Sequence, residues 1–279
     1  LLGVGGYASV PAVLAARTLG LPVVLQEQNR RPGMANRLLA PLARTVCVVD
    51  EEAARFFPAR RTRATGNPVP GERAVAGRAE ELGLEAGRFT LLVVGGSLGA
   101  VALNRLMAEA APHLAPWAAR LQVVHACGDH PVEPLVRAYA EAGIPARVLP
   151  FIDRMGAAYA AADAVVARAG ALTCQELANA GLPALLIPYP YAAGDHQWHN
   201  ALRLREVGAA EVVRQAEVDG ARVAETVRRW LEESGRLRRQ GEAARRLARP
   251  EAARRVAEAL LAAAGGGSKG RSPQPPEPV

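Results

Sequence analysis

The sequence predicts an α/β protein made of two doubly wound parallel-sheet domains, the first of them incomplete. Continuous apolar runs of strand length alternate with segments of helix length along most of the 279 residues. Such alternation is typical of parallel sheets that are covered by helices on both faces. Several of the runs end in glycine-rich turns, and the carboxyl ends of the strands are where sheets of this kind bind ligands.

The first series of elements is short and begins in the middle of a strand–helix unit. Its predicted strands are residues 1–4, 21–29 and 45–50, and its predicted helices are residues 10–19, 34–43 and 51–57. An independent α/β domain rarely starts in mid-unit, so we expect residues 1–66 to be the remnant of an N-terminal Rossmann-like domain. The segment TGNPVPGERA has two prolines and two glycines among polar residues, which predicts an interdomain linker at 67–74.

A second, complete series follows the linker. Its predicted strands are residues 89–97, 120–128, 146–152, 163–168 and 183–190. Its predicted helices are residues 99–111, 132–143, 154–162, 173–181 and 195–208. An arginine-rich helical stretch comes next, so we expect the second Rossmann-like domain to span residues 75–262. Residues 263–279 are rich in glycine and then in proline, which predicts a disordered tail.

Charge and cysteine content narrow the class of protein. The formal net charge is +7 and the isoelectric point is near 10.0, but most of the C-terminal arginines alternate with glutamates, a pattern typical of a solvated helix face. No aromatic stacking platform accompanies the charge, so we expect no nucleic-acid partner; contact with an anionic membrane surface stays open. Three widely spaced cysteines, Cys47, Cys127 and Cys174, indicate reduced thiols. No apolar run is long enough to span a membrane, so we expect a soluble or peripheral protein.

The main functional question lies in the stretch RAGALTCQELANAGLPALLIP, residues 168–188. Gly170–Thr173 form an elbow after a predicted strand, and Glu176 lies near the start of the next helix. One interpretation is a capping box, with Thr173 as N-cap and Glu176 three residues on. The other is a nucleotide site, with phosphates at the helix N-terminus and Glu176 on a ribose. The pattern taken alone slightly favours the capping box.

Other polar residues also follow predicted strands. VVGGSLGA, residues 93–100, places Ser97 at a strand-to-helix turn, either as a phosphate contact or as an N-cap. Glu27, Gln28 and Asn29 follow another strand, and either knit their loop together or face a cleft. His125, at a strand end, is interpreted as a hydrogen-bonded core residue.

A third polar group lies at the predicted helix start within YAAGDHQWHNAL, residues 191–202. His196, Gln197 and Asn200 share faces of this helix, and their neutral donors and acceptors suit sugar hydroxyls. Asp195 has the simpler interpretation of an N-cap. His196 and His199 have no second acidic or thiolate ligand nearby in the sequence, so we expect no metal site.

Six segments, taken in order, resemble the MurG family of bacterial peptidoglycan glycosyltransferases. They are GVGGYASVPAVLAARTLGLPVVLQEQNRRPGMANRLLA, TGNPV, LLVVGGSLGAVALN, PFIDRMGAAYAAAD, RAGALTCQELANAGLPALLIPYP and DHQWHNA. The resemblance runs from residue 1 to about residue 260. It implies a GT-B fold and an inverting, metal-independent enzyme without cofactor, which transfers GlcNAc from UDP-GlcNAc to lipid I and makes lipid II. It also implies a peripheral protein at the cytoplasmic face of the bacterial inner membrane.

The resemblance also implies roles for individual residues. The elbow residues Gly170, Ala171, Leu172 and Thr173 would hold the diphosphate, and Glu176 would accept hydrogen bonds from the ribose. The backbone of Ile152 would meet the uracil. The remaining implied donor contacts are Ser97 near the phosphates, His196, Gln197 and Asn200 on the GlcNAc hydroxyls, and Asn29 from the first domain.

Several positions depart from the family pattern. Leu98 stands where the family usually has Gln, and Pro70 stands where Arg commonly follows the sequence GNPV, so one polar contact and one cation are missing. HACG at residues 125–128 also differs from the usual His-Gln-x-Gly. The glycine-rich loop whose histidine assists the base is not in this sequence, so the catalytic residue is unknown here. We therefore expect this chain alone to be inactive or very weak.

Two rival hypotheses remain at the level of sequence. One is a non-catalytic module or fragment that binds a nucleotide sugar. The other is a different GT-B enzyme, such as a lipid glucosyltransferase, or a UDP-GlcNAc epimerase. Sugar specificity would separate the glycosyltransferases, and an epimerase would need acid and base residues in the cleft that the sequence does not offer.

Overall fold

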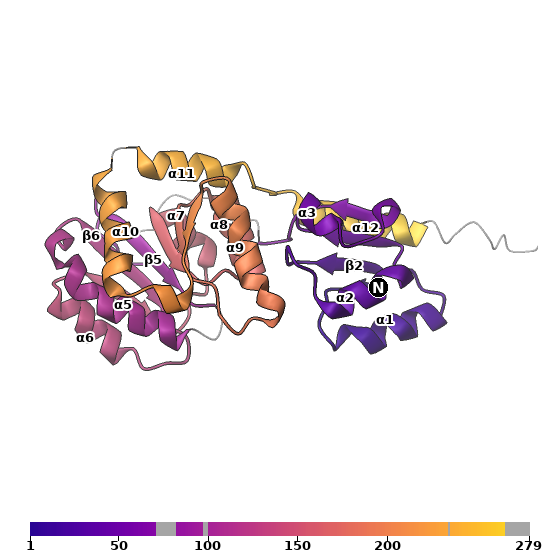
Figure 1. Ribbon diagram of the computed structural model, residues 1–279, viewed down its shortest axis with the longest axis horizontal. Helices are drawn as coiled ribbons and strands as arrows, with labels where there is room; N and C mark the ends of the chain where they lie inside the picture. The colour runs from indigo at the N-terminus through magenta and orange to yellow at the C-terminus, as the bar shows by residue number, and fades with distance from the viewer. Residues whose placement is uncertain (71–81, 97–99, 234, 266–279) are drawn as a thin grey trace, which may run out of the picture. The chain divides into compact units, whose positions relative to one another are not determined.

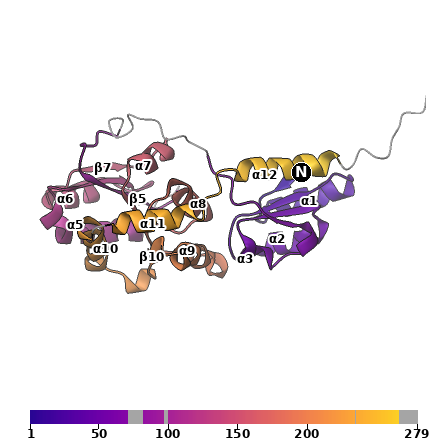
Figure 2. The same ribbon diagram turned by 90° about the horizontal axis from the view of Figure 1, so that it is seen from above.

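The computed structural model describes residues 1–70, 82–96, 100–233 and 235–265, and divides the chain into two compact units. The first unit combines Leu1–Pro68 with the chain from Glu251 onward, and the second is Val69–Pro250. Both units contain a parallel sheet flanked by helices (Figures 1 and 2). No helix in the described part of the chain is long and apolar enough to cross a membrane.

The first unit contains a four-stranded parallel sheet in the order β1-β2-β3-β4. The strands are β1 (Leu2–Gly3), β2 (Val24–Glu27), β3 (Thr45–Val48) and β4 (Thr62–Ala64). The helices are α1 (Ser9–Thr18), α2 (Met34–Leu39), η1 (Ala40–Leu42), α3 (Glu51–Ala54), η2 (Ala59–Arg61) and α12 (Ala252–Gly265). In register, Val24 of β2 lies beside Thr45 of β3, so the buried side chains of the two strands line up across the sheet.

Strand alternation gives this sheet two apolar faces. Leu25, Val46 and Val48 pack with Val13 of α1 in one fully buried cluster. Val24 and Cys47 point to the opposite face, where Val256, Ala259 and Ala263 of α12 cover them. Figure 1 shows α12, in yellow, lying along this sheet.

The position of α12 corrects the expected domain boundary. Residues 252–262 were expected in the second domain, but they complete the first unit because their apolar face covers β2 and β3. Residues 263–265, expected in the tail, continue the same helix, and Arg44 donates a hydrogen bond to the carbonyl of Ala263 at 2.9 Å. The rest of the predicted tail, residues 266–279, lies outside the described residues.

The expected linker also differs from the structure where it can be seen. Asn67, predicted to be its first residue, is fully buried in the first unit. Its side chain accepts a hydrogen bond from Gln26 at 3.2 Å and donates one to the carbonyl of Gln28 at 2.8 Å. This residue therefore belongs to the β2 loop, and the expected linker residues 71–74 lie outside the described part.

The second unit contains a six-stranded parallel sheet in the order β10-β9-β8-β5-β6-β7. Its strands are β5 (Phe89–Val94), β6 (Leu121–Ala126), β7 (Ala146–Leu149), β8 (Ala164–Ala167), β9 (Ala184–Leu186) and β10 (Ala210–Val212). Its longer helices are α5 (Val101–Leu114), α6 (Glu133–Glu141), α7 (Met155–Ala161), α8 (Ala171–Ala180), α9 (His196–Glu206), α10 (Gly220–Glu232) and α11 (Arg236–Arg245). Its short 3-10 turns are η3 (Ala115–Trp117), η4 (Ala193–Asp195) and η5 (Gln215–Glu217).

The strand order reverses direction between β5 and β8. From β5 the chain proceeds to β6 and β7 on one side, and from β8 to β9 and β10 on the other. Alternating residues of β5 pack on opposite faces: Leu91 and Val93 in the cluster with α5, α6 and α10, Leu92 and Val94 in the cluster with α7, α8 and α9. The carboxyl ends of β5 and β8 thus form a topological switch point, the usual ligand crevice of such sheets.

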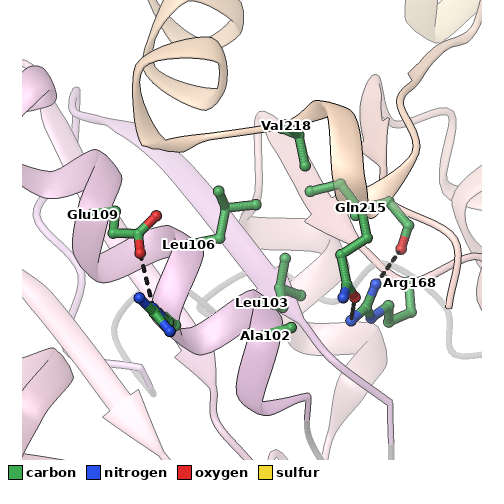
Figure 3. Close-up of a pocket in the computed structure, with 9 residues that line it drawn as sticks. Ala102, Leu103, Leu106, Glu109, Arg168, Gln215 and Val218 are labelled. Carbon is green, nitrogen blue, oxygen red and sulfur yellow. Dashed lines mark hydrogen bonds and ion pairs between the residues drawn. The ribbon is translucent and has the colours of Figure 1, made fainter. Parts of the chain in front are cut away.

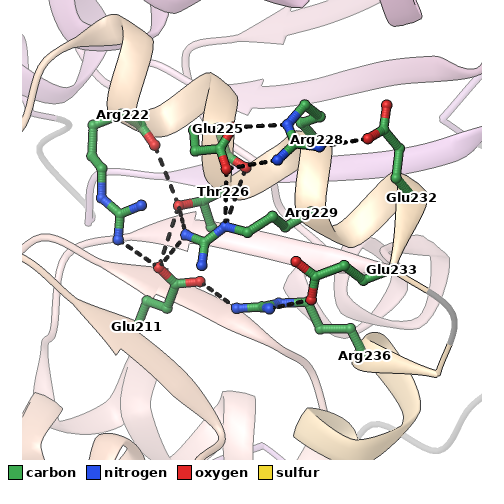
Figure 4. Close-up of polar contacts among 9 residues, drawn as sticks. All are labelled: Glu211, Arg222, Glu225, Thr226, Arg228, Arg229, Glu232, Glu233 and Arg236. Carbon is green, nitrogen blue, oxygen red and sulfur yellow. Dashed lines mark hydrogen bonds and ion pairs between the residues drawn. The ribbon is translucent and has the colours of Figure 1, made fainter.

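Polar contacts attach α10 and α11 to the edge strand β10. The carboxylate of Glu211 accepts hydrogen bonds from Arg222 at 2.8 Å, Arg229 at 2.9 Å and Arg236 at 2.8 Å (Figure 4). Its side chain is only 16% exposed. The C-terminal arginines interpreted as a solvated face are in these three cases inter-element contacts.

Candidate functional site

The elbow after β8 leads into a helix whose N-terminus has no side-chain cap in the described part of the chain. Gly170 is the N-cap residue, in an extended conformation, and α8 begins at Ala171. The first turn of a helix presents backbone N–H groups that lack intrahelical acceptors, and the helix dipole makes this end favourable for an anion. Gly170, Ala171, Leu172 and Thr173 therefore lie at the switch point in a geometry that suits a diphosphate.

The capping-box interpretation is wrong. Thr173 was expected to be the N-cap, but it is the third residue of α8, and Glu176 lies in the second turn of the helix. The helix starts two residues earlier than expected, at Ala171, with Gly170 as its N-cap. Glu176 is left without a capping role.

Glu176 instead pairs with a buried tyrosine. The hydroxyl of Tyr159, on α7, donates a hydrogen bond to Oε2 of Glu176 at 3.0 Å. Burial raises the pKa of Glu176, and the bond from Tyr159 partly opposes that shift. Burial and the neighbouring carboxylate raise the pKa of Tyr159 well above its usual range. Tyr159 thus holds the carboxylate of Glu176 in place as a hydrogen-bond acceptor, one turn inside the N-terminus of α8.

The side chains at the start of α9 hold the loops around the elbow. Asn200 is buried, and its Nδ2 donates to the carbonyl of Ala169 at 3.3 Å. Oε1 of Gln197 accepts from the backbone N–H of Tyr189 at 2.9 Å. Nδ1 of His196 lies 2.9 Å from the carbonyl of Ala193. The structure thus places Asn200 against the residue before the elbow and Gln197 against the loop after β9, whereas the printed contact of His196 lies within its own turn.

Asp195 does not act as the cap that its position suggests. It is the N-cap residue of α9 with a φ of +55°, and its side chain makes no capping bond. Its carboxylate forms an ion pair with Arg214 at 3.2 Å. The left-handed backbone, which Asp tolerates better than most residues, turns the chain sharply into α9.

Arg168, which was not predicted from the sequence, connects the elbow after β8 to the loop after β9 and to η5. Arg168, the residue after β8, is only 6% exposed, and its guanidinium donates to the carbonyls of Ile187 at 2.9 Å and Pro188 at 3.3 Å. It also donates to Oε1 of Gln215 at 2.6 Å (Figure 3). A charged residue directly after a fully apolar strand was the available signal, because a buried arginine needs fixed acceptors.

Arg168 and Gln215 line a cavity of about 160 Å³ beside α5. Leu103, Leu106 and Val218 form its apolar wall, and Glu109 at its edge is paired with Arg105 at 3.0 Å. Burial lowers the pKa of Arg168. The arginine is held by neutral oxygens, so it fixes the carboxyl end of β9 against β8.

The remaining predicted site residues have different outcomes. The side chain of Ile152 is buried in the cluster that contains Tyr159 and Leu177, which sets its backbone beside α7 and α8. Ser97 lies outside the described residues. Asn29 belongs to the first unit, where its N–H and its Nδ2 donate to Oε1 of Glu27 at 2.8 and 3.2 Å.

Glu27 knits its loop together, which is one of the two alternatives left open by the sequence. Besides Asn29, it accepts hydrogen bonds from the N–H of Gly33 at 3.1 Å and from Asn36 at 2.9 Å. It is 3% exposed. This carboxylate fixes the path of the chain from β2 into α2, and so fixes the backbone of Asn29.

His125 is a buried residue of β6 in the described part of the chain. No cluster of three or more metal-ligating side chains is present there. Burial lowers the pKa of His125 to about 3, and its ring nitrogens lie 3.0 Å from the hydroxyl of Tyr139 and 3.1 Å from Oδ1 of Asn104. His125 is therefore the neutral, hydrogen-bonded core residue that the sequence predicts.

Two parallel-sheet α/β units, with a helix N-terminus at the switch point of the second, define a GT-B glycosyltransferase fold. The chain belongs to glycosyltransferase family 28, in its MurG group: the model of the C-terminal domain of the family matches residues 90–256, and that of the N-terminal domain matches residues 1–48.

Individual relatives support this assignment. The chain is 43% identical over 94% of its length to the UDP-N-acetylglucosamine--N-acetylmuramyl-(pentapeptide) pyrophosphoryl-undecaprenol N-acetylglucosamine transferase of Geobacter metallireducens, of which it covers 72%. The Myxococcus xanthus protein of the same name is 41% identical, over 94% of this chain and 68% of that one. The crystal structure of Acinetobacter baumannii MurG superimposes with a TM-score of 0.76 at 36% identity, over 94% and 74% of the two chains.

Proposed function

We propose that this protein transfers GlcNAc from UDP-GlcNAc to the MurNAc 4-hydroxyl of lipid I, giving lipid II for peptidoglycan synthesis. The relatives carry this activity in their names. The structural observation that carries the proposal is the position of the α8 N-terminus at the switch point, with Gly170 as its N-cap and the acceptor Glu176 one turn behind it. A diphosphate and the ribose diol attached to it fit that pair of features.

The proposed reaction inverts the anomeric carbon. The acceptor hydroxyl attacks that carbon, the bond to the diphosphate oxygen breaks, and UDP leaves with the electron pair. The N–H groups of Leu172 and Thr173 and the dipole of α8 stabilise the developing negative charge where a metal ion would otherwise do so. Ile152 meets the uracil through its backbone, and Gln197, His196 and Asn200 face the sugar. We assign the base that takes the hydroxyl proton to no described residue.

Calorimetric titration tests the donor site. We expect saturable binding of UDP-GlcNAc that is stronger than binding of UDP-glucose. Loss of a charge-assisted hydrogen bond costs about 1.5–3 kcal/mol, so Glu176→Ala should weaken binding at least tenfold. Glu141→Ala, which removes an exposed carboxylate from the end of α6, is the matched control. Equal affinity for the two sugars would favour another GT-B transferase.

Product formation separates the transferase from a non-catalytic nucleotide-sugar-binding module. The assay is transfer of labelled GlcNAc to a lipid I analogue. Because the glycine-rich loop and its histidine are not in this sequence, we expect this chain alone to give little or no product. Lipid II formation that requires Glu176 would contradict that expectation and support the transferase, whereas donor binding without product by a chain that carries the loop would favour the binding module.

We further propose a peripheral position at the cytoplasmic face of the inner membrane, and no nucleic-acid partner. Arg17, Arg44 and Arg61 line a cavity of about 400 Å³ in the first unit, and the described lining holds no acidic side chain. Leu19, at the end of the neighbouring helix α1, is 74% exposed. Cations next to exposed apolar side chains favour an anionic lipid surface. Cosedimentation with phosphatidylglycerol vesicles should therefore fall with rising salt, and Leu19→Ser should reduce it.

A further inference from the structure

Two tyrosines stand exposed beyond the carboxyl end of β9. Tyr189 is 44% exposed and Tyr191 is 81% exposed. Their rings form an edge-to-face pair with centroids 5.6 Å apart. Large aromatic side chains in solvent have a hydration cost that a ligand can relieve.

Tyr189 is held in place although it is exposed. Its N–H donates to Oε1 of Gln197 at 2.9 Å, and its carbonyl accepts from the N–H of Ala192 at 3.3 Å. The guanidinium carbon of Arg168 lies 5.8 Å from the centroid of its ring, and Arg168 holds the two carbonyls just before it. A surface fixed before binding loses little conformational freedom when a ligand arrives.

The strand order indicates what lies next to this pair. The strands follow each other as β7, β6, β5, β8 and β9 across the sheet. The proposed function, on which this inference rests, places the uracil near Ile152, after β7, and the diphosphate at α8, after β8. A nucleotide sugar laid along that edge reaches β9 with its sugar end.

We propose that Tyr189 and Tyr191 form an aromatic platform for the pyranose ring of the donor sugar. One face of a pyranose presents axial C–H groups, which pack on aromatic rings, while its hydroxyls point outward to polar groups. Gln197 and His196, from the start of α9, belong to the same loop region and supply such groups. The tyrosines thus contribute affinity for the sugar, and the elbow contributes affinity for the nucleotide.

The test compares UDP-GlcNAc with UDP, which lacks the sugar. Calorimetry is done on the whole chain, on Tyr191→Ala and on Tyr191→Phe. We expect Tyr191→Ala to weaken UDP-GlcNAc about tenfold, as expected for loss of an aromatic contact, and to leave UDP unchanged. Tyr191→Phe, which keeps the ring, should bind both as the unchanged protein does. Val136→Ala, which shortens an exposed apolar side chain on α6, is the matched control.

Other outcomes would overturn the platform. Equal weakening of UDP and UDP-GlcNAc would place the tyrosines on the nucleotide, and no change in either would remove them from the donor site. Failure of the unchanged protein to bind UDP-GlcNAc would instead overturn the proposed function and the platform with it.

Discussion

At the scale of single residues, the site depends on a carboxylate that burial makes harder to ionise. Glu176 is ionised only at the cost of desolvation, and Tyr159 supplies the one described hydrogen bond that offsets this cost. A ribose diol would donate further hydrogen bonds to the same oxygens. Ligand binding and ionisation of Glu176 are therefore coupled.

The first prediction is a pH dependence of donor binding. The ionised form of Glu176 accepts the bonds from the ribose, so affinity for UDP-GlcNAc should fall as the pH drops through the raised pKa of Glu176. The fall should begin at a pH above the ordinary range of a glutamate. The diphosphate diester of UDP-GlcNAc stays ionised there, so calorimetry from neutral to acidic pH isolates the protein group. Glu176→Gln should bind weakly and without this dependence.

The same raised pKa has the opposite effect on the stability of the unliganded protein. The folded state holds the proton of Glu176 more tightly than the unfolded state, so stability falls as the pH rises between the two pKa values. We therefore expect Glu176→Gln to be somewhat more stable than the unchanged protein to urea at neutral pH. A lower urea midpoint for Glu176→Gln would contradict the assignment of desolvation as the main cause.

Single residues also mark the limit of prediction from sequence. Glu176 and the elbow could be found, because both follow a strand in a recognisable motif. The bond from Tyr159 and the ties of Arg168 could not, since they join residues 17 to 47 positions apart in the chain. Thr173 was misread because a serine or threonine three residues before a glutamate resembles a capping box in any register.

At the scale of elements, glycines set how closely the helices approach each other. A Cβ at Gly220, the first residue of α10, would lie 2.4 Å from the backbone carbonyl carbon of Glu109 on α5. Backbone cannot move aside as a flexible side chain can. The contact between α5 and α10 therefore requires glycine at this position.

The second prediction follows from that contact. Gly220→Ala should destabilise the second unit by about 1–3 kcal/mol, because the extra methyl separates α10 from α5. Urea unfolding followed by tryptophan fluorescence measures this, since Trp230 lies on α10. Val101→Ala, which shortens a 64% exposed side chain on α5 in the same unit, should leave the midpoint unchanged.

The third prediction concerns the ion pairs of β10. Glu211→Gln leaves three arginines without their shared carboxylate and should cost about 2 kcal/mol. Glu242→Gln removes the exposed partner of Arg238, whose side chain is 72% exposed, and should cost about 0.5 kcal/mol or less. Both variants are measured by urea unfolding. Equal losses of stability would mean that Glu211 does not hold α10 and α11 to β10.

Element boundaries were predictable where the apolar period was clear. Five of the six strands of the second sheet, β5 to β9, fall within the expected ranges because each lies in a mostly apolar run between turns. The edge strand β10 was not predicted, because it is only three residues long and has Glu211 at its centre. The ion pairs that join α10 and α11 to β10 could not be predicted. A sequence of alternating Arg and Glu is the same whether the side chains face solvent or connect two elements. Only the fold brings Glu211 to three of the arginines.

At the scale of the whole molecule, the first unit is made from both ends of the described chain. The sheet of residues 2–64 has one face covered only when α12 packs on it. The sequence did not predict this, because an amphipathic helix that follows a complete domain could cover either sheet. The apolar stripe of α12, formed by Val256, Ala259 and Ala263, packs on the first sheet because Val24 and Cys47 leave an apolar face there to be covered.

The fourth prediction uses this arrangement. Val256→Asp buries an unpaired charge and should destabilise the first unit by about 3 kcal/mol or more. All three tryptophans, Trp117, Trp198 and Trp230, lie in the second unit. Far-UV circular dichroism should therefore show an early transition that tryptophan fluorescence does not. Leu261, on the same helix, is 72% exposed, so Leu261→Asp should cause neither the destabilisation nor the early transition.

The return of α12 also sets an order of events during protein synthesis. The second unit is continuous from Val69 to Pro250, so all of it leaves the ribosome before α12 does. At about 5–20 residues per second, roughly 10–40 s separate Cys47 from the helix that covers it. During that interval the nascent chain carries a bare apolar sheet face with an accessible thiol. A brief pulse of a thiol-alkylating reagent on stalled ribosomes should therefore label Cys47 until residues 252–265 have emerged, and not afterwards.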